Sequence, residues 1–111
     1  MLKKSLRLST EQINEVMEKG TVVHSPLFTI RYIKRDTGAT KFAAVAPKGV
    51  AKTAVSRNRE RRRVYAAIAG IKKGVKPGFL VAIISKNKAI GAEFSVLQIE
   101  LNENLIKAKI I

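Results

Sequence analysis

Hydrophobic residues recur at helical spacing in three stretches of the chain, and in the stretches between them they alternate with polar residues or run together. The first helical stretch covers residues 10–19. Ser9, just before it, and Gln12, inside it, have the spacing of a capping box. Gly20 follows it as a stop signal. Its apolar stripe consists of Ile13, Val16 and Met17. This pattern predicts a short helix over 10–19.

Strand-like patterns fill most of the remaining chain. Residues 27–33 alternate and are followed by a turn at Asp36-Thr37-Gly38 and a returning strand over 41–46, while 20–23 form a further candidate strand. One face of the 27–33 strand would carry Phe28, Ile30 and Tyr32, and the other Thr29, Arg31 and Ile33. Residues 79–85 are almost continuously apolar, which favours a strand that is covered on both faces.

Two further helices complete the pattern. Residues 51–70 predict a long helix closed by Gly70, with an apolar face of Val64, Ile68 and Ile71. Ser95 and Gln98 resemble a second capping box, and the final helix then follows Leu97, Leu101 and Leu105. The order α-β-β-β-α-β-α predicts an α+β fold, a two-layer α/β sandwich, with residues 1–111 forming a single domain.

Charge changes the expected function more than it changes the fold. The 111 residues contain 22 Lys and Arg against 8 Asp and Glu, a formal net charge of +14 at pH 7. Such an excess points to a polyanionic partner, nucleic acid before an acidic membrane. The chain has no cysteine and one histidine, which excludes disulfides, thiolate zinc sites and multi-histidine metal sites. No apolar run is long enough for a secretory signal or a membrane span, so we expect a cytoplasmic protein with no membrane partner.

The positive charge is concentrated in the predicted long helix. Five arginines fall within seven positions, and Glu60 alone offsets Arg57, Arg59, Arg61, Arg62 and Arg63. Helical periodicity directs Arg59, Arg62 and Arg63 away from the apolar face. Arg57 and Arg61 lie within about 40° of it. We therefore expect the N-terminal half of the helix to extend beyond the sheet, with these two on the rim of a groove. A merely solvated face is the weaker interpretation, because solvated helices normally mix charges of both signs.

The run Ala-Val-Ser-Arg-Asn-Arg-Glu-Arg-Arg at residues 54–62 resembles the signature of the bacterial ribonuclease P protein subunit, Ala-Val-x-Arg-Asn-Arg-x-Lys/Arg-Arg. The resemblance covers nearly the whole chain. It departs from the family pattern at Tyr65 and Ala66, where Arg-Glu is frequent, and at Ile13 and Met17, where Phe is frequent.

The resemblance implies a ribosomal-protein-like fold with a left-handed βαβ crossover. It also implies a non-catalytic subunit of the endoribonuclease that removes the 5′ leader of precursor tRNA. The active site and the Mg²⁺ requirement then belong to the RNA subunit, and the protein itself binds no cofactor. The implied contacts with ribonuclease P RNA are Lys48, Lys52, Arg57, Asn58, Arg59, Arg61 and Arg62. The implied cleft for the leader of precursor tRNA consists of Ile13, Met17, Phe28 and Tyr32.

The residues themselves agree with a non-catalytic role. A nuclease site needs clustered carboxylates or a histidine base, whereas the eight carboxylates are scattered and His24 has no partner residues. Phe28 and Tyr32 fit core packing as well as base stacking, and only the resemblance favours stacking. A structural RNA-binding protein of ribosomal type remains the alternative function. A DNA-binding protein would need a helix-turn-helix partner upstream of 51–70, where the sequence predicts a strand and a loop.

Overall fold

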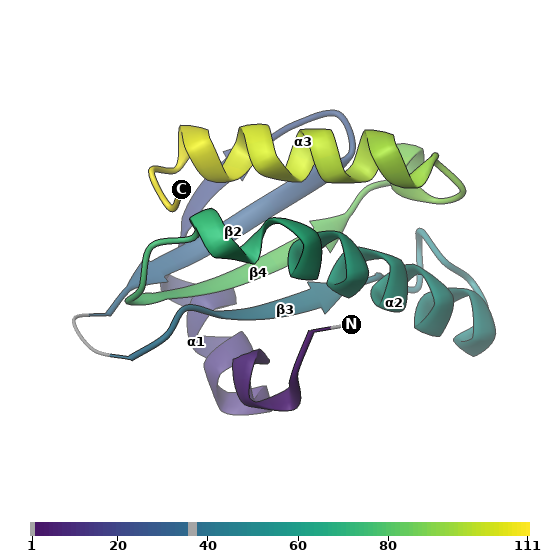
Figure 1. Cartoon of the computed structure of the whole chain (residues 1–111). Coiled ribbons are helices and arrows are strands. Elements are labelled where there is room, and N and C mark those ends of the chain that lie inside the picture. Colours follow the sequence, from purple (N-terminus) through teal and green to yellow (C-terminus); the bar gives the residue numbers. More distant parts are fainter. Residues whose placement is uncertain (1, 36–37) are drawn as a thin grey trace.

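The elements of the computed structural model follow the predicted order, and the structure describes residues 2–35 and 38–111 (Figure 1). The helices are α1 (Thr10–Lys19), α2 (Ala54–Ile71) and α3 (Phe94–Lys107). The strands are β1 (Thr21–His24), β2 (Phe28–Lys34), β3 (Lys41–Val45) and β4 (Phe79–Ser85). Short 3-10 turns occur at η1 (Lys4–Leu6), η2 (Lys72–Gly74) and η3 (Asn87–Ala89). The turn expected at Asp36-Thr37-Gly38 falls partly on residues 36–37, which lie outside the described residues.

The four strands form one mixed sheet in the order β1-β2-β4-β3. β2 pairs antiparallel with β1 and with β4, so that Ile30 lies opposite Val23 on one side and Ile83 on the other. β3 runs parallel to β4, and α2 makes the connection between them. The left-handed sense of this crossover stays a prediction of the family resemblance.

Helices cover the two faces of the sheet unequally. α2 and α3 pack side by side on one face (Figure 1), over a core that includes Phe28, Phe42, Val81, Ile68 and Leu101. The short helix α1 packs on the other face over a smaller cluster of Leu8, Val16, Ala43, Leu80 and Ala82. The predicted α/β sandwich is confirmed in the sheet and its α2–α3 layer, and α1 adds a partial cover behind it.

Capping explains where the helices begin. Ser9 and Gln12 make both hydrogen bonds of the predicted capping box, 2.9 and 3.2 Å long. α2 begins at Ala54 and not at 51, because the Thr53 hydroxyl accepts a hydrogen bond from the Ser56 amide at 3.0 Å.

The predicted capping box at Ser95 and Gln98 is wrong. α3 already begins at Phe94, and Glu93 occupies its N-cap position without a side-chain hydrogen bond. Gln98 instead uses its side chain in a contact between helices, where Nε2 donates to the Ala67 carbonyl at 3.3 Å.

The segment before α1 holds α2 and the free edge of β3 together. The Leu8 amide donates to the Phe42 carbonyl, and Arg7 stacks over the Tyr65 ring at 4.4 Å from its centroid. The Tyr65 hydroxyl accepts from the Ala44 amide at 3.2 Å, which joins α2 to β3. These contacts cover an edge that would otherwise expose unpaired backbone groups.

Candidate nucleic-acid interface

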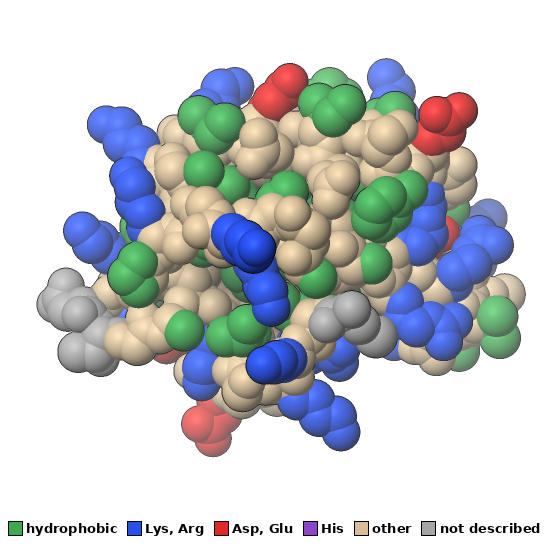
Figure 2. All heavy atoms as spheres, in the orientation of Figure 1, with side chains coloured by type: hydrophobic (Ala, Val, Ile, Leu, Met, Phe, Trp, Pro, Cys, Tyr) green, Lys and Arg blue, Asp and Glu red, His purple; other side chains and the backbone are tan. Residues whose placement is uncertain are grey.

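The N-terminal half of α2 has few contacts with the rest of the protein. Residues 54–59 include no buried side chain, and Val55 is 77% exposed. Figure 1 shows α2 continuing past the end of β3, and Figure 2 shows Lys and Arg side chains gathered around this part of the helix. The expectation that this half extends beyond the sheet is therefore confirmed.

The structure brings the predicted RNA-contacting residues together on this half of α2 and on the loop before it. We call this surface the arginine face. Its exposed members are Lys48, Lys52, Asn58, Arg59 and Arg62, and its half-buried members are Arg57 and Arg61.

The arginines of this face differ in how the protein holds them. Arg57 donates from Nη1 to the Ala51 carbonyl at 3.0 Å, and Arg61 donates from Nη2 to the Asn58 side-chain oxygen. Arg62 has no hydrogen bond or ion pair among the described residues. Arg62 is therefore the most available cation on the helix, while Arg57 also fixes the loop that precedes it.

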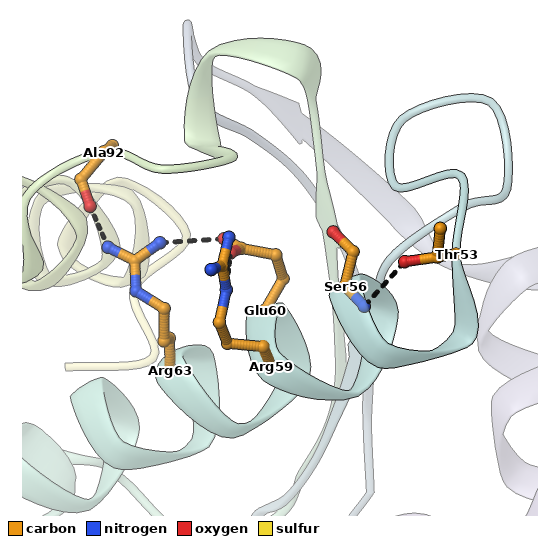
Figure 3. Close-up of polar contacts among 6 residues, drawn as sticks. All are labelled: Thr53, Ser56, Arg59, Glu60, Arg63 and Ala92. Atoms are coloured by element: carbon orange, nitrogen blue, oxygen red, sulfur yellow. Dashed lines mark hydrogen bonds and ion pairs between the residues drawn. The ribbon is translucent and has the colours of Figure 1, made fainter.

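Arg63 has a different position from the one that periodicity predicts. Its side chain is 23% exposed and lies against the start of α3, where Nη2 donates to the Ala92 carbonyl (Figure 3). Its Nη1 donates to Oε1 of Glu60 at 2.8 Å. The expectation that Arg63 points outward is wrong, because this pair of acceptors draws it inward.

Glu60 is the one residue of this region that sequence reasoning missed. It is only 2% exposed, although it stands among five arginines. A signal was present in its spacing, since Glu60 precedes the buried residues Val64 and Ile68 by one and two turns on the same helix face.

The helix end adds to the positive potential of the arginine face. The first backbone N–H groups of a helix lack intrahelical acceptors, and the helix dipole places positive potential there. Together with the exposed cations, these groups make a surface suited to phosphate oxygens, which Arg binds through its planar fork. The arrangement favours a polyanion over a small neutral ligand.

The four residues of the predicted leader cleft do not come together. Phe28 is fully buried in the core beneath α2 and α3, and Tyr32 packs on the same side, edge-on to Phe79 with ring centroids 6.2 Å apart. Ile13 packs on the opposite face with α1, and Met17, on the same helix, is 38% exposed. The predicted grouping is wrong because the 28-30-32 face of β2 is the one that the two long helices cover.

An open part of the sheet remains on the α1 side. α1 packs over Leu80 and Ala82. Beyond it on this face, His24 opposite Thr29 is exposed, and a row of other residues is half-buried. We call them the open strip: Val22, Thr29, Arg31, Val45 and Ile84. Arg31 donates from Nη1 to the Met17 carbonyl at 3.1 Å. Since Val45 ends β3 just before the loop with Lys48 and Lys52, the strip adjoins the arginine face.

The described residues offer neither a metal-binding cluster nor a membrane-spanning helix. No group of three or more His, Cys, Asp or Glu side chains in residues 2–35 and 38–111 is arranged to hold a metal ion. Within the same ranges, no helix is both long enough and apolar enough to cross a membrane.

Comparisons with known proteins agree with the fold. The family model described as Ribonuclease P matches residues 2–109. The structure of the Staphylococcus aureus RNase P protein is similar, with a TM-score of 0.81 and 18% identity over 96% of this chain and 98% of that one. The Thermotoga maritima RNase P protein has a TM-score of 0.76 and 19% identity, over 88% of this chain and 94% of that one. No curated protein matches the chain significantly.

Proposed function

The chain belongs to the ribonuclease P protein family, and on that premise we propose that it binds the RNA subunit of ribonuclease P and the 5′ leader of precursor tRNA. It assists the endonucleolytic removal of the leader, which gives the mature 5′ end of the tRNA. In this proposal the active site and the Mg²⁺ ions belong to the RNA subunit. The protein acts in the cytoplasm and binds no cofactor of its own.

The arginine face is the observation that carries the proposal. It combines exposed Arg62, Lys48 and Lys52, which have no partners among the described residues, with Arg59 and the positive potential of a helix N-terminus. RNA presents phosphates at regular intervals, and each one neutralised by a cation releases counterions. A basic surface on a helix whose second half is buried in the core can therefore bind the RNA subunit with a defined orientation.

The leader of precursor tRNA occupies the open strip in this proposal. Val22, Val45 and Ile84 offer a shallow apolar surface to bases, and Arg31 offers a cation to the backbone. Such a surface suits a single strand without sequence preference, because every base has an apolar face. Of the predicted cleft, Met17 borders the strip through its carbonyl contact with Arg31, and Ile13 packs on the cluster that α1 covers. Phe28 and Tyr32 support the core on the other face.

Reconstitution tests the proposed subunit role. The purified chain, a ribonuclease P RNA transcribed in vitro and a precursor tRNA are combined at low Mg²⁺, where repulsion between phosphates opposes assembly. We expect cleavage at the mature 5′ end only when the chain and the RNA are both present. Cleavage by the chain alone would place catalysis in the protein. Selective purification of ribosomal RNA with the chain from its source cell would favour a structural ribosomal role instead.

Leader length tests the open strip. In the assembled enzyme, Arg31→Ala should weaken the binding of precursor tRNA by about 1–3 kcal/mol, as the loss of a charge-assisted contact does, and leave mature tRNA binding unchanged. Tyr32→Ala is the matched control, since the ring belongs to the core. It should lower the melting temperature and leave the ratio of precursor to mature affinity at the parent's value. Equal ratios in both variants would remove the leader from this strip.

A further inference from the structure

A buried carboxylate lies inside the most basic segment of the chain. The Glu60 side chain is 3% exposed, and its two oxygens contact two different arginines of the same helix. Burial of an isolated carboxylate is strongly unfavourable, and contacts with arginines offset that cost. Neither the arginine face nor the hydrophobic core by itself accounts for a carboxylate at this position.

Glu60 is the middle member of a chain of polar contacts that runs from the connection between β4 and α3 to the arginine face (Figure 3). The Ala92 carbonyl, in the connection before α3, accepts from Nη2 of Arg63, and Nη1 of Arg63 donates to Oε1 of Glu60 at 2.8 Å. The other carboxylate oxygen, Oε2, accepts from Nε of Arg59 at 3.3 Å. The inner contacts are fixed by burial, and the outer end is an arginine whose side chain is 60% exposed.

We propose that Glu60 is a positioning residue that orients the Arg59 guanidinium toward a phosphate of the RNA subunit. This role rests on the proposed function. The contact to Glu60 uses Nε of Arg59, and its Nη1 and Nη2 have no hydrogen bond among the described residues. These two nitrogens remain available to a phosphate as the outer edge of the fork. A guanidinium held in this way has less rotational freedom to lose on binding.

Charge alone leads to the opposite expectation. Glu60 lowers the positive charge of the arginine face, so its removal should strengthen RNA binding if only net charge matters. Glu103 provides a matched control, because it is an exposed carboxylate on α3 and its neutralisation changes the net charge by the same amount. Glu60→Gln and Glu103→Gln therefore separate positioning from net charge.

The Gln substitution breaks the two contacts of Glu60 unequally. Its carbonyl oxygen can still accept from Arg63, while its NH₂ group cannot accept from Nε of Arg59. We expect Glu60→Gln to weaken binding to an in vitro transcribed ribonuclease P RNA about tenfold, within the range of coupling between contacting residues. Glu103→Gln should bind as tightly as the parent or slightly more tightly.

The decisive measurement repeats the substitution in an Arg59→Ala background. If Glu60 acts through Arg59, Glu60→Gln should change the affinity less than about twofold there, because its target is gone. An equal loss in both backgrounds would show a purely structural role, and binding like that of Glu103→Gln would show that only charge matters. Either result overturns the proposal.

Two further measurements distinguish a failure of the positioning role from a failure of the proposed function. Hydrogen exchange at Nε–H of Arg59, followed by NMR in the free protein, should be slow in the parent and fast in Glu60→Gln. This measurement does not depend on RNA. Equally fast exchange in the parent and in Glu60→Gln would contradict the contact between Arg59 and Glu60. A parent chain that binds ribonuclease P RNA no better than an unrelated RNA of equal length would overturn the proposed function, and the positioning role with it.

Discussion

The two halves of α2 have different roles although they form one continuous helix. Residues 54–63 contain all five arginines of the run, and Glu60 is the only buried residue in this half of the helix. Residues 64–71 contain no charged residue and bury Val64, Ala67 and Ile68 against the sheet and α3. The second half therefore fixes the helix in the fold, and the first half presents charge to the solvent.

This difference shows what a binding helix of this kind requires. Arginines near a helix N-terminus repel one another and are opposed by the helix dipole, so the first half has little intrinsic stability. Its support comes from the Thr53 cap, the Arg57 bond to the Ala51 carbonyl and the Arg63 bond to the Ala92 carbonyl. The apolar half supplies the burial that these polar contacts cannot.

The largest expected effect tests the apolar half. Ile68 is fully buried between the sheet and α3, and Ile68→Ala should lower the free energy of unfolding by about 2–5 kcal/mol. Urea denaturation measures this loss. The salt dependence of RNA binding by the folded variant should stay at the parent's slope, since no phosphate contact is removed.

Ile99→Ala is the control for this loss, because Ile99 is 60% exposed on α3. Its expected change is within about 0.5 kcal/mol. Similar losses in the two variants would mean that the second half of α2 does not anchor the helix.

A pair of neighbouring arginines tests the division more directly. Arg62→Ala should weaken RNA binding by about 1–3 kcal/mol and lower the log–log salt slope by roughly one contact, with the melting temperature unchanged. Arg63→Ala should instead destabilise the fold by about 1–3 kcal/mol, because it leaves the Ala92 carbonyl and one oxygen of Glu60 without their donor. Thermal melts and salt titrations of both variants measure these effects. A stability loss in Arg62→Ala with a binding loss in Arg63→Ala would contradict the division between the two arginines.

The sequence predicts the fold and the place of the arginine face. It predicts less well which face of the sheet the helices cover and which partners single side chains take. The capping box at Ser9 and the element order depend on local patterns, and the structure retains both. Alternation in β2 separates Phe28 and Tyr32 from Arg31, but it cannot say which face the long helices cover. That choice is made by packing between distant segments, and it decides whether an aromatic ring stacks on a base or fills the core.

The same limit applies to individual polar side chains. Helical periodicity predicts that Arg63 points outward, because the pattern depends on α2 alone. In the structure the side chain points inward, where it donates to a carbonyl of the β4–α3 connection. Gln98 has the spacing of a cap residue but contacts Ala67 of α2 instead. Glu60 was predictable as a buried position from its spacing to Val64, although its partners depend on the tertiary structure.

The smallest effect tests the N-terminal end of α2, where the cap is Thr53. Thr53→Ala removes the acceptor for the Ser56 amide and should cost about 1 kcal/mol of helix stability. Because residues 54–59 have no buried side chain to retain them, the loss should appear as local fraying, with faster amide hydrogen exchange in the first turns of α2 and little change in global unfolding.

Ser9→Ala removes the equivalent acceptor from α1 and is the matched control. RNA binding should weaken several-fold in Thr53→Ala alone, since the frayed turns must reorder when Arg57 and Arg59 engage phosphate. Equal RNA affinity in the two cap variants would mean that RNA binding does not depend on an ordered first half, and the arginines would then act through charge alone.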